Sequence, residues 1–523
     1  MQRPGVGRAL MGALALTLLL VSAASARPLR GGRYGGSIVV GLQNGAPTNL
    51  DPVGSSSGAT IEVFLAMCQR LYQTVSNHGV IERVPMLATS LPTPSPDRRT
   101  YTVQLRQGVL FNDGTPFNAQ AVVTSIQRYM TDPASTRVSD YADVASVSAA
   151  GLYTVAFHMK PGYHTLVLNY SFIMSPTALA KEGANFAANP VCVGPFMYDS
   201  QVSDVSVTLV KSPYYYDKGL IHLDKIVYVS ANDGPFAAAA LEAGDIQAVD
   251  NLDPTQVPGV EENAGLHVLN GAGLGWNGIR FNIGNNHGVG NLPYAKNVGT
   301  DMSSSPLLRQ AFEEAIDRNT VNRVAFGGLY QPTCTPVPPA NTLWYPAIKV
   351  PCTPYNPADA RRLVARSGIA NPTVDLCTGG SATERTRVAL VVQAEEKAVG
   401  INVVIALGCG SSTPNFDASV SAFQPGSDGD PNYLITQLFA TWGSLNQSGY
   451  SNPRLDYVLT NGLKAAQPAA RAVNYRVAQQ ILLADRPAIF LYDTVYHAAY
   501  STNLTGIRLI PNGQLDVEYA QYR

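Results

Sequence analysis

The stretch TVDLCTGGSATERTRVALVVQAEEKAVGINVVIAL, residues 373–407, predicts a strand, a helix and a second strand in succession. TVDLC (373–377) and INVVIAL (401–407) are short apolar runs bounded by polar residues, as buried strands are. The segment between them, 383–400, has the length of a helix. Strand, helix and strand together form a βαβ unit, so the stretch favours an α/β fold.

The same alternation of strands and helices continues on both sides of this unit. Asn118 is suited to be the N-cap of its helix, and residues 305–326 predict one long amphipathic helix. No internal repeat is present. Strands are predicted at 37–42, 101–106, 152–159, 205–210, 224–229 and 488–495, and helices at 61–72, 118–130, 236–244, 305–326, 356–368 and 470–486.

Length and composition indicate a large folded protein. The 523 residues exceed what one hydrophobic core usually serves, so two or three domains are expected. Apolar residues make up 46% of the chain and charged residues 14%, which argues against disorder. The formal net charge is −1, so the chain lacks the excess of positive charge that nucleic-acid-binding proteins carry.

The N-terminus has the build of a secretory signal peptide. Arg3 and Arg8 precede an apolar run from Ala9 to Val21, and ASA at 24–26 fits a small-residue cleavage site. Residues 1–26 are therefore predicted to be removed. No cysteine follows the apolar run, so a lipid anchor is not expected, and no second apolar run of about 20 residues appears. The sequence predicts a soluble exported protein.

All six cysteines lie in the mature part, which suggests disulfide bonds in an oxidising compartment. Closeness in sequence favours a bond between Cys334 and Cys352. Cys377 and Cys409 each end a strand-like run, so their sulfurs could meet if those strands are neighbours. Buried free thiols are the alternative interpretation. The remaining pair is Cys68 and Cys192.

Two glycine motifs lack the context that catalysis needs. GSSSG (54–58) has the form of a hydrolase elbow built on Ser56, but NLDPV precedes it instead of an apolar strand. GLGWNG (273–278) has the dinucleotide-binding form, but a strand pattern follows it instead of a helix. The histidines form no H-x-x-x-H or H-E-x-x-H pair. We expect no enzyme activity, no cofactor and no metal site.

A long, ordered set of segments resembles one family. VPMLATSLPTPSPDRRTYTVQLRQGVLFNDGTPFNAQAVVTSIQRY (84–129) is similar to the signature region of the family 5 extracellular solute-binding proteins. These are the dipeptide-, oligopeptide- and nickel-binding subunits of ABC importers. Further similar segments cover essentially the whole mature chain: NLDP (49–52), VGPFMY (193–198), HLDKIVYV (222–229), LEAGDIQAVD (241–250), LRQAFEEAIDRNTV (308–321), YNPADARRLVARSG (355–368) and NQSGYSNPRLDYVL (446–459).

The resemblance implies a two-lobed periplasmic-binding-protein fold of class II, with an extra subdomain inserted in the first lobe. The chain would cross between the lobes near residues 270 and 490. Closure of the lobes over a solute would precede docking on a membrane permease. The implied division is a discontinuous first lobe at 27–70, 190–270 and 491–523, an inserted subdomain at 71–189, and a second lobe at 271–490.

Two acids are the first candidates for cargo contact. Asp428 and Asp430 flank a glycine in the loop FQPGSDGDP (423–431), beyond a predicted strand. They are either solvated turn formers or partly buried partners of a cationic ligand group, a contact that contributes roughly 1.5–3 kcal/mol. In peptide-binding relatives an Asp just before a D-P step holds the peptide ammonium group, and Asp428 is the nearest match. Relatives often carry a Trp ahead of these acids, where this chain has Phe423.

The family resemblance adds further candidate ligand contacts. Family pockets draw on the loop after the first strand, here Asn44 to Thr48, and on the second lobe near Trp276 and Trp442. Arg280 could meet a ligand carboxylate, or it could pair with an acid of the protein.

Three functions follow as hypotheses. The first is a periplasmic, monomeric binding protein that delivers a peptide-like, cationic solute to an ABC permease. The second keeps this role but replaces the peptide by a metal chelate, a sugar or another small organic solute. The third, of a different class, is an exported serine hydrolase that uses Ser56.

Overall fold

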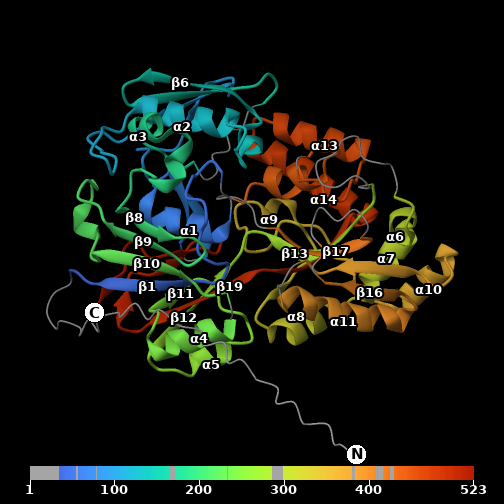
Figure 1. Cartoon of the computed structure of the whole chain (residues 1–523). Coiled ribbons are helices and arrows are strands. Elements are labelled where there is room, and N and C mark those ends of the chain that lie inside the picture. Colours follow the sequence, from blue (N-terminus) through green and yellow to red (C-terminus); the bar gives the residue numbers. More distant parts are fainter. Residues whose placement is uncertain are drawn as a thin grey trace, which may run out of the picture. The chain divides into compact units, whose positions relative to one another are not determined.

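The predicted signal peptide, Ser56 and Asp428 lie outside the residues that the structure describes. Among the described residues, no helix combines the length and the apolar character that crossing a bilayer requires. The computed structural model (Figure 1) describes residues 34–54, 57–77, 79–163, 166, 171–232, 234–284, 298–379, 383–407, 409, 416–423, 429–443 and 445–523.

A seven-stranded sheet forms the centre of the first lobe. Its strands are β1 (Ser37–Leu42), β8 (Phe196–Val202), β9 (Ser206–Lys211), β10 (Lys225–Ser230), β11 (Ala248–Val249), β12 (Leu266–Ala272) and β19 (Val495–Ser501). Their spatial order is β12-β19-β11-β1-β10-β9-β8. β1 runs parallel to β10 and β11, whereas β19 runs antiparallel to β11 and β12.

Helices cover both faces of this sheet, because successive side chains of a strand point to opposite faces. Ile38 and Val40 of β1 belong to one core cluster, together with residues of α1 (Gly58–Met67). Val39 packs against a separate cluster, which holds residues of α4 (Gly234–Ala243) and α5 (Val257–Glu261). Figure 1 shows α1 above this sheet and α4 and α5 below it.

A six-stranded sheet forms the centre of the second lobe. Its strands are β13 (Trp276–Phe281), β14 (Gln331–Pro332), β15 (Thr373–Cys377), β16 (Asn402–Ala406), β17 (Ala418–Phe423) and β18 (Ala488–Asp493), in the spatial order β14-β18-β13-β17-β15-β16. β15 is parallel to β16 and to β17, and α11 (Thr383–Val399) connects β15 to β16. The predicted βαβ unit is therefore confirmed.

The predicted single helix over residues 305–326 is wrong. The segment forms two helices, α7 (Pro306–Ala315) and α8 (Arg318–Phe326), and Ile316 between them is extended, with φ −90° and ψ 118°. The side chain of Asp317 accepts a hydrogen bond from the backbone N–H of Asn319 and so caps α8. The apolar spacing continues through the break, so periodicity alone could not reveal it.

Residues 72–159 add two small sheets to the first lobe. β2 (Tyr72–Asn77) and β3 (Val80–Pro85) form a hairpin, and β4 (Thr93–Pro94), β5 (Thr100–Gln104), β7 (Thr154–Met159) and β6 (Val144–Gly151) form a four-stranded sheet. α2 (Ala119–Thr131) packs on β6. The predicted N-cap is confirmed, because the Asn118 side chain accepts from the N–H of Ala121.

The remaining elements are shorter or lie at the periphery of the two sheets. They are η1 (Val138–Tyr141), α3 (Pro176–Glu182), η2 (Gly183–Ala188), η3 (Lys218–Leu220), α6 (Asp301–Ser304), α9 (Tyr345–Ile348), α10 (Pro357–Ser367), η4 (Asn432–Thr436), α12 (Gln437–Phe439), α13 (Pro453–Lys464), α14 (Pro468–Asp485), β20 (Leu504–Thr505), β21 (Arg508–Leu509), β22 (Leu515–Asp516) and β23 (Gln521–Tyr522).

The chain passes between the two sheets through two very short segments. β12 ends at Ala272 in the first sheet, and β13 begins at Trp276 in the second. On the return, β18 ends at Asp493 and β19 begins at Val495. Residues 491–493, which the sequence-based division assigns to the first lobe, belong to a strand of the second sheet.

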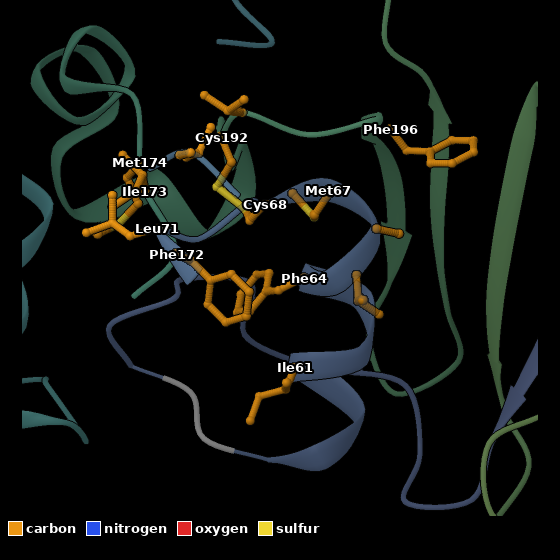
Figure 2. Close-up of a cluster of buried hydrophobic side chains, with 14 of the residues drawn as sticks. Ile61, Phe64, Met67, Cys68, Leu71, Phe172, Ile173, Met174, Cys192 and Phe196 are labelled. Carbon is orange, nitrogen blue, oxygen red and sulfur yellow. A yellow bond between two sulfur atoms is a disulfide. The ribbon is translucent and has the colours of Figure 1, made fainter. Parts of the chain in front are cut away.

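All three suggested disulfides are present: Cys68–Cys192, Cys334–Cys352 and Cys377–Cys409. Figure 2 shows the first of them beside Met67, at the end of α1. Phe64 of the same helix packs on Phe172, with ring centroids 5.1 Å apart. The bond therefore joins the end of α1 to the segment that enters β8, within the main core cluster of the first lobe.

We predict that removing Cys68–Cys192 destabilises the protein more than removing Cys334–Cys352. The bonds close loops with sequence separations of 124 and 18. Loop-closure entropy then gives about 5 and about 3 kcal/mol, respectively. Melting temperatures of the two double Cys→Ala variants check this order. Thiol titration of the unfolded, unreduced wild type is the control, and a larger loss for Cys334–Cys352 would contradict the prediction.

Candidate functional site

The two sheets meet at their carboxyl edges. β12 runs parallel to β11, so its last residue lies at the same edge as the last residues of β1, β10 and β11. β13 is antiparallel to β17 and to β18, so its first residue lies beside their last residues. Both crossings therefore join the carboxyl edge of one sheet to that of the other. Ligands of open α/β sheets bind outside such edges, where the strand order reverses.

In the first sheet the strand order reverses between β1 and β11. The chain leaves β1 toward β8, β9 and β10 on one side, and leaves β11 toward β12 on the other. Gln43 and Asp250 directly follow these two strands, and the N–H of Gln43 donates to Oδ1 of Asp250 at 2.8 Å. Burial raises the pKa of Asp250 to about 6, and hydrogen bonds from backbone N–H groups oppose the rise.

The predicted contact loop from Asn44 to Thr48 begins at this reversal point. Its backbone is fixed by the N–H of Ala46, which donates to Oγ of Ser230 at 2.7 Å, and by Gln201, whose amide donates to the carbonyl of Pro47. Asn44 and Thr48 themselves are exposed to solvent. The loop thus presents two exposed polar side chains on a fixed backbone.

In the second sheet the order reverses between β15 and β17. β15 leads through α11 to β16, whereas β17 leads away toward β18 on the far side of β13. The disulfide Cys377–Cys409 ties the last residue of β15 to the segment that follows β16. Cys377 is paired with Ser419 of β17, and Ser419 is paired with Arg280 of β13. Arg280 therefore lies in line with the end of β15.

Hydrogen bonds link the two crossings to each other. The N–H of Gly273 donates to the carbonyl of Thr494 at 2.7 Å, and the amide of Asn277 donates to the Thr494 hydroxyl. Asp493 is almost fully buried beside them. Burial raises the pKa of its carboxyl to about 8, and the hydroxyl of Thr333 opposes part of the rise.

The structure places Asp430 in an ion pair inside the protein. Arg471 of α14 donates to both of its oxygens, at 2.9 and 2.7 Å, and both side chains are buried. The Arg471 guanidinium also lies over the ring of Trp344, 4.9 Å from its centroid. Asp430 raises the pKa of Arg471 against the effect of burial. This pair anchors Asp430, just before η4, to α14.

The two predicted tryptophans have different surroundings. Trp276 is fully buried, stacks on Phe439 at 6.3 Å and meets Phe490 edge-on at 4.8 Å. Its indole Nε1 is buried and has no hydrogen-bond partner among the described residues. Trp442 is 46% exposed and follows α12 in a turn. Trp276 thus belongs to the core of the second lobe at its carboxyl edge, whereas Trp442 lies on the surface.

Several contacts in the described part of the chain connect the two lobes away from the crossings. Arg387 of α11 donates to both oxygens of Asp253 at 3.1 Å, and the N–H of Ile81 in β3 donates to Oγ1 of Thr342 at 3.0 Å. Tyr330 stacks on His497 with ring centroids 5.9 Å apart. Burial lowers the pKa of His497 to about 4, so its imidazole is neutral at pH 7.

Sequence reasoning missed three ionisable groups at these edges, namely Asp250, Asp493 and Arg385. Asp250 directly follows β11, Asp493 is the last residue of β18, and Arg385 lies in the first turn of the helix after β15. The position of Arg385 shortly after the predicted strand 373–377 of a βαβ unit is a signal that could have found it, whereas Asp493 lies inside the predicted strand 488–495 and β11 is not among the predicted strands. Among the described residues, no group of three or more His, Cys, Asp or Glu side chains could hold a metal ion.

Comparison with known proteins gives one family and one fold. The sequence profile of the bacterial extracellular solute-binding proteins, family 5 (middle), matches residues 82–444. The glutathione-binding protein GsiB of Shigella flexneri serotype 5b is 28% identical over 494 residues, covering 90% of this chain and 92% of the relative. The protein of the same name from Pectobacterium atrosepticum is 29% identical over 493 residues, covering 90% and 92%.

Solved structures confirm the predicted two-lobed fold. The oligopeptide-binding protein AppA from Bacillus subtilis, in complex with a nonapeptide, has a TM-score of 0.77 at 22% identity, covering 94% of this chain and 100% of that one. NikZ from Campylobacter jejuni, in complex with Ni(L-His), has a TM-score of 0.77 at 18% identity, covering 93% and 99%. At such identities the likeness establishes the fold alone.

We predict that Asp430→Asn lowers the melting temperature of the ligand-free protein strongly. The substitution leaves Arg471 buried without its counter-charge, which costs about 3–5 kcal/mol. Asp245→Asn, at an exposed position, is the matched control and should leave the melting temperature unchanged. An unchanged melting temperature together with lost cargo binding would instead identify Asp430 as a ligand contact.

We also predict that Asp493→Asn stabilises the protein increasingly as pH rises. The pKa of Asp493 lies above that of the unfolded chain, so the folded state binds the extra proton and wild type loses stability between about pH 4 and about pH 8. Asparagine stays neutral and avoids this loss. The difference in melting temperature between variant and wild type should grow from pH 5 to pH 8, and a flat difference would refute the assignment.

Proposed function

The chain belongs to the family 5 bacterial extracellular solute-binding proteins, and we propose that it captures a peptide-like small solute between its two lobes for import. Solute-binding proteins of this family bind peptide-like ligands and deliver them to ABC permeases. The specific solute and the permease of this chain are part of the proposal. We also propose that the signal peptide at 1–26 directs its export, that it is periplasmic without a lipid anchor, and that it is monomeric.

One observation carries the proposal. The points of strand reversal in both sheets lie at carboxyl edges that are joined by residues 273–275 and by Thr494. A solute placed there contacts both lobes at once. Such a solute lowers the free energy of the closed arrangement relative to an open one, because only the closed arrangement provides both sets of contacts.

A binding role is favoured over catalysis. The polar groups at the two edges are the amide of Gln43, the carboxyls of Asp250 and Asp493 and the guanidinium of Arg385, together with the exposed side chains of Asn44 and Thr48. The hydrolase alternative rests on Ser56 alone, in a motif without the preceding strand that a nucleophile elbow needs. We infer that the protein holds its cargo by noncovalent contacts and needs no cofactor, metal or nucleic acid.

A peptide-like cargo is favoured by the relatives. The curated relatives are named for glutathione, a tripeptide, and AppA was solved with a nonapeptide. We propose Asp428 as the partner of a cargo ammonium group. In this proposal, Asp430 holds the loop through Arg471, and the side chain of Asn341 adds a hydrogen bond of 2.7 Å to the carbonyl of Gly429. Trp276 would support the floor of the site, and Trp442 its rim.

The main alternative is a non-peptide solute. The NikZ structure contains Ni(L-His), so the fold also accommodates a metal chelate, and sugars or other small organic molecules remain within the same hypothesis. Only the chemistry of the cargo separates these versions of the function.

We predict that the protein retains or binds a peptide-like solute, and that Asp428→Ala weakens this binding at least about tenfold, since charge-assisted hydrogen bonds contribute roughly 1.5–3 kcal/mol. Native mass spectrometry after gentle purification identifies retained cargo. Calorimetry with glutathione and a dipeptide and oligopeptide panel then measures affinity. Asp245→Ala is the control. A retained sugar or metal chelate, with no binding of any peptide, would replace peptide cargo by the alternative.

A further inference from the structure

An ion pair joins the two lobes away from the crossings. Arg387, on α11 of the second lobe, donates through Nη2 to both oxygens of Asp253, at 3.1 Å each. Asp253 follows β11 in the first lobe, and a Cβ atom placed on Gly234, the first residue of α4, would lie 3.3 Å from its Cβ. Both partners are partly exposed. Such a pair contributes little unless its side chains are held in place before they meet.

Each partner is held in place by its own lobe. Oδ1 of Asp253 accepts hydrogen bonds from the N–H and the hydroxyl of Thr255, at 2.9 and 2.6 Å. Nε of Arg387 donates to the carbonyl of Ala325 in α8 at 2.8 Å. Burial opposes the ionisation of Asp253, but the hydrogen bonds from Thr255 and the charge of Arg387 outweigh it and lower its pKa. Because none of these supporting hydrogen bonds spans the lobes, both partners stay oriented when the lobes separate.

The lobes are in contact on both faces of the first sheet. Asp253 lies on the face that α4 and α5 cover, since Leu252 and Val257 on either side of it belong to the core cluster of these helices. On the opposite face, the N–H of Ile81 in the inserted subdomain donates to the Thr342 hydroxyl of the second lobe at 3.0 Å. Figure 1 shows α4 and α5 below the sheet and α2 and α3 of the inserted subdomain above it. A rotation about the crossings that separates the lobes therefore breaks at least one of these contacts, so this arrangement is a closed one.

A second acid, Glu384, lies within electrostatic reach of Asp253 across the interface. Glu384 is three residues before Arg387 on α11, on the same side of the helix, and it accepts a hydrogen bond from Tyr330 at 3.3 Å. Burial raises the pKa of Glu384, the charge of Asp253 raises it further, and the charge of Arg387 opposes the rise. Arg385 opposes it more weakly. Arg387 is therefore the main counter-charge for one acid of each lobe.

We propose that Arg387 is the latch of the closed arrangement: it attracts Asp253, and it offsets the repulsion between Asp253 and Glu384. This inference rests on the proposed function and concerns the regulation of the same site. Without Arg387, the two lobes would present like charges to each other, which favours their separation. With it, the closed arrangement has a stability of its own, to which cargo contacts add. Since release requires opening, the latch also lengthens the time for which a bound cargo is retained.

The first test measures the separation of the lobes in the ligand-free protein. Spin labels on Val202→Cys and Val404→Cys report it, because both positions are exposed and lie on β8 and β16, the edge strands farthest from the crossing strands in each sheet. We expect Arg387→Gln to shift the ratio of short to long distances about tenfold toward long ones. Asp253→Asn should shift it less, because Arg387 then still neutralises Glu384. An unchanged ratio in Arg387→Gln would overturn the proposal.

The second test is a rescue. Glu384→Gln, introduced into Arg387→Gln, removes the opposed acid and should restore most of the short-distance population, whereas alone it should change little. Arg366→Gln, exposed on α10, is the matched control and should leave the ratio unchanged. A missing rescue would refute the role of Arg387 as a counter-charge. If Arg387→Gln does not fold, Arg387→Lys replaces it in the first test, because lysine keeps the charge but loses the bidentate geometry; a shift of about threefold is then expected, and no shift overturns the proposal.

Failure of this inference is distinguishable from failure of the proposed function, because neither test uses cargo. If no peptide binds wild type, the peptide cargo is refuted, and the distance ratio still decides the role of Arg387. For each peptide that binds, we expect dissociation measured by stopped flow to be about tenfold faster in Arg387→Gln, in step with the shifted ratio. An unchanged dissociation rate would overturn the role of the latch in cargo retention.

Discussion

The hydrogen bond from Gly273 to Thr494 is the contact on which the rest of the site depends. It joins the two crossings at the one place where the chain passes between the sheets. Because each crossing is so short, the carboxyl edges of both sheets stay close together, independently of the conformation of the loops elsewhere. Gln43 and Asp250 lie at the edge of the first sheet and Asn277 and Asp493 at the edge of the second, so the connectivity of the strands brings the two edges together.

The buried ionisable groups of the second lobe and of the crossings differ in how the free-energy cost of burying a charge is reduced. Asp430 and Arg471 neutralise each other beside Trp344, and Asp430 also accepts a hydrogen bond from the N–H of Asn432 at 2.9 Å. Asp493 avoids charge through a raised pKa, and His497 does so through a lowered one. Arg280 has neither solution, since a guanidinium with a pKa of about 10 stays protonated at pH 7.

Much of the fold could be predicted from the sequence, because its signals are local. The βαβ unit, the Asn118 cap and the pairing of Cys377 with Cys409 follow from patterns within a few dozen residues. The break at Asp317 could not, since the apolar spacing runs through it. The partner of Asp430 lies 41 residues away in α14, where tertiary packing places it, and the neighbours of Arg280 are set by sheet register. The site candidates Asn44, Thr48, Trp276, Trp442 and Asp428 remain predictions.

The bond between Cys68 and Cys192 has a topological consequence for the inserted subdomain. Its two sulfurs are separated by 124 residues and enclose β2 to β7, α2 and α3. The whole insert is thus a covalent ring attached to the first lobe at one point. A protease that cuts once inside this ring releases no fragment. A pulling force applied to the two chain termini is transmitted through the disulfide, so it does not extend the residues inside the ring. The subdomain can consequently vary in sequence, or be exchanged as a cassette, without altering the covalent path that connects the two sheets.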